Sequence, residues 1–226
     1  MTIQPHLSPR LCPSMHLMFA STTMVACLTV VGLAADTASG GAVPEQRCLT
    51  NALSLSEALE PVIEAVTDGR PNRVPLAATR AQAWWAAHRT SFANPAALDT
   101  AMSSLHTLAS THRAPLAARA ALVASTAALD ACSETPTEAA HLMRIDLAGM
   151  AGWLRAHGVD APFPRGVAQA AQSIDDRLRA SGHGAMAEGL RKELAATLAI
   201  PVRVEGNVHA ADSLLQRVDE IEQALR

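Results

Sequence analysis

The sequence has few aromatic side chains and almost no lysine. Its 226 residues include three tryptophans, three phenylalanines and no tyrosine, and Lys192 is the single lysine. β-Branched residues are also sparse, whereas alanine is the most frequent residue and leucine is plentiful. Because alanine and leucine favour helices, while the strand-forming residues are in short supply, the composition predicts an all-α protein.

Motifs that carry catalysis or nucleotide binding are missing from the sequence. It contains no nucleophile elbow, P-loop, dinucleotide-binding glycine pattern, H-E-x-x-H or C-x-x-C. The 18 basic and 21 acidic residues are interspersed, whereas binding to nucleic acid needs a concentrated basic surface. We therefore expect neither an enzyme nor a nucleic-acid-binding protein, and we assign no catalytic residue and no cofactor.

The N-terminal segment has the pattern of a secretory signal peptide. Arg10 precedes an uncharged apolar stretch from Leu17 to Ala35, which ends in small residues before the polar sequence DTASGG. We expect cleavage near Ala35 and a periplasmic or secreted protein. Two alternatives stay open: the stretch is nearly long enough to serve as an uncleaved membrane anchor, and MVAC resembles a lipoprotein processing site that would place a lipid on Cys27.

The cysteines are consistent with export. After cleavage only Cys48 and Cys132 remain, and an oxidising compartment lets two such thiols form a disulfide. The sequence thus predicts a Cys48–Cys132 bond. We divide the chain into a signal peptide or membrane anchor at residues 1–35, a flexible lead-in at 36–48 and one helical domain at 49–226.

Apolar residues recur at three- and four-residue spacing along this domain, which is the pattern of amphipathic helices. Several prolines precede alanine- and leucine-rich runs, as proline does at the first helical position; they are Pro75, Pro95, Pro115 and Pro136. The fold class we predict is an antiparallel helical bundle of about seven to eight helices after the N-terminal segment. The expected helices are Leu53–Val66, Pro75–Phe92, Pro95–Leu108, Pro115–Ala131, Pro136–His157, Arg165–Ala180, Ala185–Leu198 and Val208–Leu225.

Local signals refine some of these helices. Ser54 with Glu57, and Thr135 with Glu138, have the spacing of capping boxes. Pro61 is expected to kink or restart the first helix. The core faces we expect include Met102, Leu105, Leu122, Met143, Leu147, Met150, Leu154, Ile174, Leu178, Leu190, Leu194 and Leu198.

The last helix has a regular apolar seam with charges between its members. Ala211, Leu214, Val218, Ile221 and Leu225 alternate at three and four residues. Such a seam joins a second subunit in a coiled coil, but two heptads are fewer than that structure needs. We expect it to pack on its own bundle, with self-association through this helix as the alternative.

The adjacent Trp84 and Trp85 are the most distinctive feature of an aromatic-poor chain. Neighbouring residues of a helix point about 100° apart, so one indole should enter the core while the other lies at a groove. His88 follows one turn later on the same side. Core filling is one interpretation; the other is a ligand-binding groove formed by Trp84, Trp85 and His88, with Trp153 as a further wall.

Histidines and methionines provide a weaker metal signal. Glu138 and His141 have the E-x-x-H spacing of di-iron bundles, but no second copy occurs. Met102 with His106, and Met150 with His157, share helical faces and are ligand types that suit copper. No dense cluster of these residues occurs, so we assign no metal ligand.

The function we expect is that of an exported, non-catalytic module that binds a small molecule or a protein partner. Periplasmic copper or iron binding through histidine and methionine is one alternative, and a structural scaffold for a protein partner is another. In each case the membrane is involved only through the N-terminal segment, if that segment is retained or lipidated.

Overall fold

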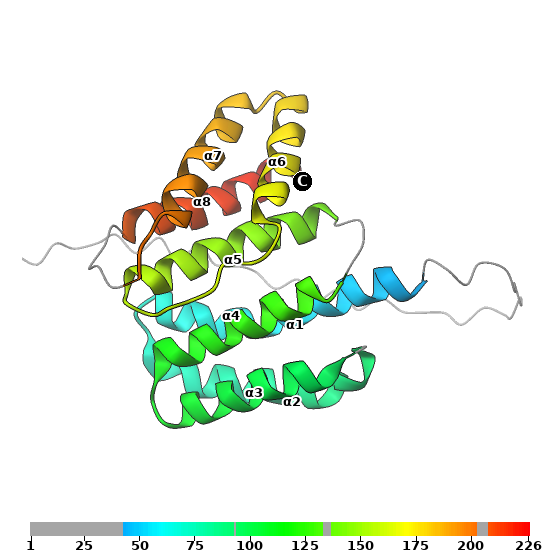
Figure 1. The fold of residues 1–226 in the computed structure, drawn as a ribbon, viewed down its shortest axis with the longest axis vertical. Coiled ribbons are helices and arrows are strands. Elements are labelled where there is room, and N and C mark those ends of the chain that lie inside the picture. The colour runs from blue at the N-terminus through cyan, green and yellow to red at the C-terminus, as the bar shows by residue number, and fades with distance from the viewer. Residues whose placement is uncertain (1–42, 93, 133–136, 203–207) are drawn as a thin grey trace, which may run out of the picture. The chain divides into compact units, whose positions relative to one another are not determined.

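The computed structural model describes residues 43–92, 94–132, 137–202 and 208–226. The predicted signal peptide and the lipidation site at Cys27 lie outside these residues. The described part is all-helical and contains eight α-helices and no strand, which confirms the predicted fold class (Figure 1). The helices are α1 Val43–Thr67, α2 Val74–His88, α3 Pro95–Ser110, α4 Ala114–Asp130, α5 Glu138–Ala156, α6 Val167–Ala180, α7 Gly184–Leu198 and α8 Val208–Leu225, with short 3-10 turns at Pro71–Arg73 and Arg89–Ser91.

The first helix differs most from the sequence prediction. It begins at Val43 instead of Leu53 and continues through Pro61 without a break, so the predicted restart and the capping box at Ser54 are wrong. Proline removes one backbone hydrogen bond, but Leu59 and Val62 on either side of it are fully buried. Their burial stabilises the continuous helix against that loss.

The helix starts follow the proline signals in three cases out of four. Pro75, Pro95 and Pro115 lie in the first two positions of α2, α3 and α4, as predicted. α5 begins at Glu138, and the hydroxyl of Thr137 caps it by accepting a hydrogen bond from the amide of Ala140. Thr135, on which the predicted capping box depends, lies outside the described residues, and the cap that the structure describes is Thr137.

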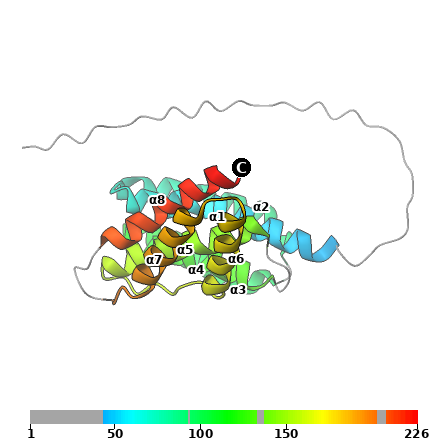
Figure 2. The ribbon, with the colours of Figure 1, turned by 90° about the horizontal axis from the view of Figure 1, so that it is seen from above.

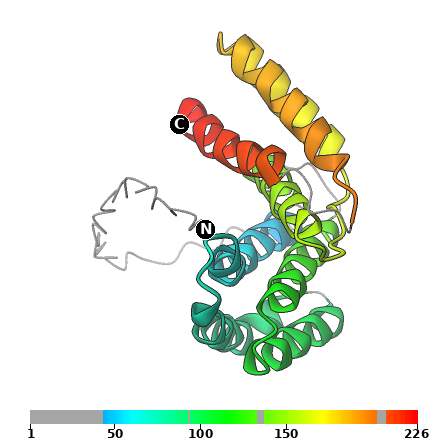
Figure 3. The ribbon, with the colours of Figure 1, turned by 90° about the vertical axis from the view of Figure 1, so that its left-hand side faces the viewer.

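The eight helices form two consecutive groups of four with the same order of contacts. In the first group α1 packs on α2 and α4, and α3 packs on α2 and α4; in the second, α5 packs on α6 and α8, and α7 packs on α6 and α8 (Figure 3). α6 and α7 form a helical hairpin closed by a short turn (Figure 2). Each group buries its own cluster of apolar side chains.

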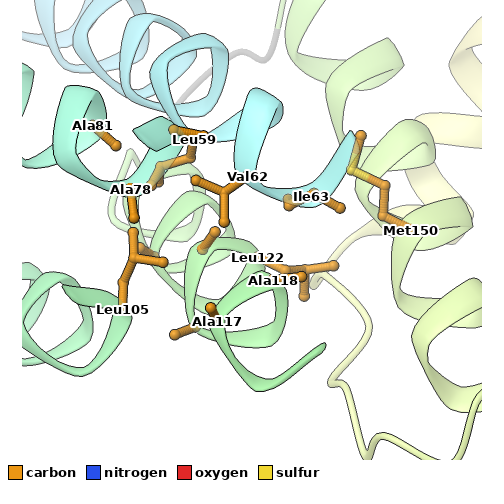
Figure 4. Close-up of a cluster of buried hydrophobic side chains, with 14 of the residues drawn as sticks. Leu59, Val62, Ile63, Ala78, Ala81, Leu105, Ala117, Ala118, Leu122 and Met150 are labelled. Atoms are coloured by element: carbon orange, nitrogen blue, oxygen red, sulfur yellow. The ribbon is translucent and has the colours of Figure 1, made fainter. Parts of the chain in front are cut away.

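The helix α5 belongs to both cores. Leu147, Met150 and Leu154 pack with the core of α1–α4, whereas Leu142 and Ile145 pack with that of α6–α8. Figure 4 shows Met150 among the side chains of the first core, next to Ile63 of α1. One helix thus supplies apolar surface to two layers, so its residues are buried on almost every side.

Two glycines let neighbouring helices approach α5 closely. A Cβ atom on Gly149 would lie 2.8 Å from Cδ2 of Leu215 in α8, and one on Gly152 would clash with Cγ2 of Thr197 in α7. Thr197 is fully buried, and its hydroxyl lies within hydrogen-bonding distance of the carbonyl oxygens of Glu193 and Ala210. The threonine therefore has no room to rotate away.

The predicted core faces are largely buried, with one clear error. Leu198 was expected to face inward but is 38% exposed at the end of α7, while the neighbouring Thr197 occupies the interior. In α8 the seam of Ala211, Leu214, Val218 and Ile221 is buried against its own chain. The seam therefore packs on its own bundle, the arrangement we expected.

The Sγ atoms of Cys48 and Cys132 lie 2.19 Å apart, and their Cα atoms lie 5.8 Å apart. The predicted disulfide is therefore present, and it joins the first turns of α1 to the residues just after α4. None of the helices in the described ranges is both long and apolar enough to cross a membrane.

We expect Gly152→Ala to lower the free energy of unfolding by about 1–3 kcal/mol, because the new methyl group overpacks the contact with Thr197. Gly184→Ala is the matched control, since nothing lies within 4 Å of its added Cβ and alanine is the better helix former. Urea unfolding measures both. Equal stabilities of the two variants would contradict the close contact between α5 and α7.

We expect the double substitution Cys48→Ala/Cys132→Ala to lower the free energy of unfolding by on the order of 4 kcal/mol. The bond closes a loop with a sequence separation of 84 residues, and its loss frees that loop in the unfolded chain. Denaturant unfolding of the oxidised protein and of the variant gives the difference. An unchanged unfolding midpoint would argue against a bond in the native protein.

Candidate functional site

The paired tryptophans of α2 have different environments. Trp85 is 4% exposed and packs in the first core, whereas Trp84 is only partly buried. Trp85 donates a hydrogen bond from Nε1 to Oδ1 of Asp99 in α3 at 2.8 Å, and Arg89 pairs with the other oxygen of that carboxylate at 2.6 Å. As their angular separation on the helix implies, one indole enters the core and the other does not.

The exposed side of this pair is covered from within the chain. The ring of His88 stacks on Trp84 with centroids 4.4 Å apart, and Phe92 contacts Trp84 edge-on at 6.4 Å. Nδ1 of His88 lies 2.7 Å from the backbone oxygen of Trp84. One face of the Trp84 indole is therefore covered by a side chain of its own helix.

Trp153 has the same arrangement at the end of α5. His157 stacks on it with centroids 3.6 Å apart, and Nδ1 of His157 lies 2.9 Å from the Trp153 backbone oxygen. In both helices a W-x-x-x-H sequence thus places an imidazole nitrogen near the tryptophan carbonyl one turn earlier, and in α5 that carbonyl also accepts the backbone amide of His157 at 3.2 Å.

The structure brings Trp84, Trp85 and His88 together but places Trp153 elsewhere. α2 packs on α1 and α3, whereas Trp153 packs beside Ile200 and Ala211 at the contact of α5 with α7 and α8. The aromatic ligand-binding groove stays a prediction. Within that prediction, Trp153 would belong to a site separate from Trp84, Trp85 and His88.

Residues considered for metal binding are dispersed. Glu138 pairs with Arg177 of α6, and His141 is buried. Met102 is buried in the core while His106 is exposed. Within the described ranges no three side chains of histidine, cysteine, aspartate or glutamate come together as a metal site.

A groove of about 460 Å³ lies between α1, α5 and α8, and the sequence analysis did not anticipate it. Its charged lining has one basic residue, Arg226, and six acidic ones: Glu57, Glu60, Glu138, Asp146, Asp219 and Glu222. Apolar side chains from the same three helices line the rest: Leu53, Leu142, Met143 and Val218. The groove thus combines acidic and apolar surface in one place.

Four of the groove's carboxylates have no basic partner among the described residues. Glu138 pairs with Arg177 and Glu222 with Arg226. The others, which form no ion pair there, are Glu57, Glu60, Asp146 and Asp219. Carboxyl groups from three helices therefore face one another across the groove, and Arg226, the one basic residue in the described lining, pairs with Glu222 at its edge.

This arrangement raises the pKa of several carboxyl groups. Burial is the largest cause for Asp146, followed by repulsion from Glu60 and Asp219, and the pKa rises to about 8. For Glu60, burial and then repulsion from Glu64 raise the pKa to about 7. Both groups therefore hold protons near neutral pH that an ordinary carboxyl would have released.

A positive charge placed in the groove would relieve this repulsion. It would favour the ionised carboxylates and expel their protons, so binding and deprotonation are coupled. The apolar lining would at the same time exclude water from one side of the ligand. The groove is suited chemically to a cationic ligand with an apolar part.

Two sequence signals point to this groove in retrospect. Glu57, Glu60 and Glu64 recur at three- and four-residue spacing along α1, a like-charge pattern that destabilises an isolated helix, and the first two of them line the groove. Asp146 interrupts the apolar run of α5, where a charge is out of place. Neither signal shows that the two helices lie side by side.

No protein-family model, curated protein or solved structure matches the chain.

We expect the free energy of unfolding to fall as the pH rises from about 6.5 to about 8.5. In the unfolded chain these carboxyl groups have lost their protons in this range, whereas in the native state Asp146 and Glu60 still hold theirs. The bound protons stabilise the native state, and raising the pH removes this stabilisation. His141, whose pKa is lowered by burial and then by Arg144, contributes the opposite slope only below about pH 6.5.

The substitution Asp146→Asn should flatten this pH dependence and make the protein more stable than the wild type at about pH 8.5. Asp176→Asn, at an exposed carboxylate of α6, should retain the wild-type slope. Thermal or urea unfolding at several pH values measures the three proteins. A wild-type stability that rises across this range would show that Asp146 is not protonated there.

Proposed function

We propose that the protein is an exported, non-catalytic binding module whose groove between α1, α5 and α8 takes a cationic ligand. The observation that carries the proposal is the set of four groove carboxylates without a basic partner in the described structure. Export is supported by the signal-like sequence of residues 17–35 and by the Cys48–Cys132 bond, since disulfides persist in oxidising compartments such as the periplasm and the cell exterior.

The groove favours an organic cation over copper or calcium. Copper sites use imidazole, thiolate or thioether ligands, whereas this lining offers carboxylates and a single methionine thioether. Calcium takes six to eight oxygen ligands close together, and the described side chains form no such cluster. A larger ligand, by contrast, can contact carboxylates that stand apart on three helices.

The proposal predicts that spermine binds and displaces protons. We expect its affinity for the purified protein to rise between about pH 6.5 and about pH 8.5, because Asp146 and Glu60 must ionise to bind it. Titration calorimetry in two buffers with different ionisation enthalpies measures the protons released. The affinity should also fall with added salt, as expected for charge pairs near a surface.

Variants separate the groove from the general charge of the protein. Glu60→Gln/Asp146→Asn should weaken spermine binding about tenfold at the higher pH, a loss of about 1.4 kcal/mol. Asp176→Asn removes a carboxylate outside the groove and should leave binding unchanged. An equal loss in both variants, or binding without proton release, would refute a specific cation site.

A further inference from the structure

We propose that the occupant of the groove is a basic amphipathic α-helix of a partner protein. This inference rests on the cationic ligand proposed above and specifies its class. It is supported by the apolar side chains that line the groove, by the carboxylates on α1 and α8 that flank them and by the packing of these helices.

The apolar lining distinguishes a helix from a small polycation. Leu142 and Val218 are buried, while Leu53 and Met143 are only partly so and present carbon and sulfur atoms toward the groove. A metal ion or a polyamine gains little from such a surface. A helix with one apolar face would bury it, and flexible methionine side chains adapt well to that kind of contact.

The spacing of charge along α1 matches that of a partner helix. Glu57 and Glu60, which line the groove, are separated by three residues and so lie on one side of α1; Glu64, four residues further on, lines a different pocket. Arginine or lysine at three-residue spacing on a second helix would meet Glu57 and Glu60 in register. Asp219 and Glu222 on α8 supply the opposite wall.

The arrangement of the helices leaves a place for one more. α1 packs mainly on α4 and α2, and α8 packs on α5 and α7, while α5 lies beneath both as the groove floor. An added helix would contact α1, α5 and α8 and would bridge the two groups of four. The apolar seam of α8 cannot supply that helix, since it is already buried within its own bundle.

The test compares three ligands with the same purified full-length protein at about pH 8.5. The first is a peptide of about 15 residues that segregates arginine and leucine on opposite helical faces. The second has the same composition in an order that mixes the two faces. The third is spermine, which carries positive charge without apolar side chains. Fluorescence anisotropy measures the peptides, with spermine as a competitor.

We expect the amphipathic peptide to bind at least about tenfold more tightly than the mixed peptide. Met143→Ala should weaken the amphipathic peptide about fivefold and leave spermine binding unchanged, because only the peptide uses the apolar floor. Glu60→Gln/Asp146→Asn should weaken both ligands. Circular dichroism melts confirm that each variant is folded.

The outcomes separate the two proposals. Equal binding of the two peptides, or an equal effect of Met143→Ala on peptide and spermine, would overturn the helical partner and leave the cation site standing. Failure of all three ligands to bind would overturn the cation site as well.

Discussion

The structure depends on one constraint: α5 must fit between two hydrophobic cores at once. A helix buried on nearly every side has to present small side chains where its neighbours come closest, and Gly149 and Gly152 do so toward α8 and α7. Close packing of this kind replaces the large aromatic side chains that the chain lacks, because short interhelical distances give many weak dispersion contacts.

The same constraint accounts for the acidic groove. α5 is covered by α6 and α7 on one side and by α1 and α4 on another, but where α1 and α8 flank it the lining mixes acidic with apolar side chains and Asp146 faces other carboxylates. Burying like charges together lowers stability. A fold that tolerates this arrangement in its most buried helix gives up stability there, which is frequent at functional sites.

The sequence was sufficient to predict the helical class, eight helices and the disulfide, because alanine-rich amphipathic periodicity and a single remaining cysteine pair are local or nearly unambiguous signals. It was insufficient where tertiary packing overrides local preference. Pro61 lies inside a helix because Leu59 and Val62 are buried around it, and Leu198 is exposed because Thr197 fills the space beside Gly152. The groove is a property of three helices that are distant in sequence, so no local pattern could locate it.

The Cys48–Cys132 bond has a consequence for the order of assembly. It connects the two ends of the first four-helix group and includes no residue of α5–α8. The first half of the chain can therefore be closed covalently before the second half has packed. The later helices then dock onto a template that is already covalently closed.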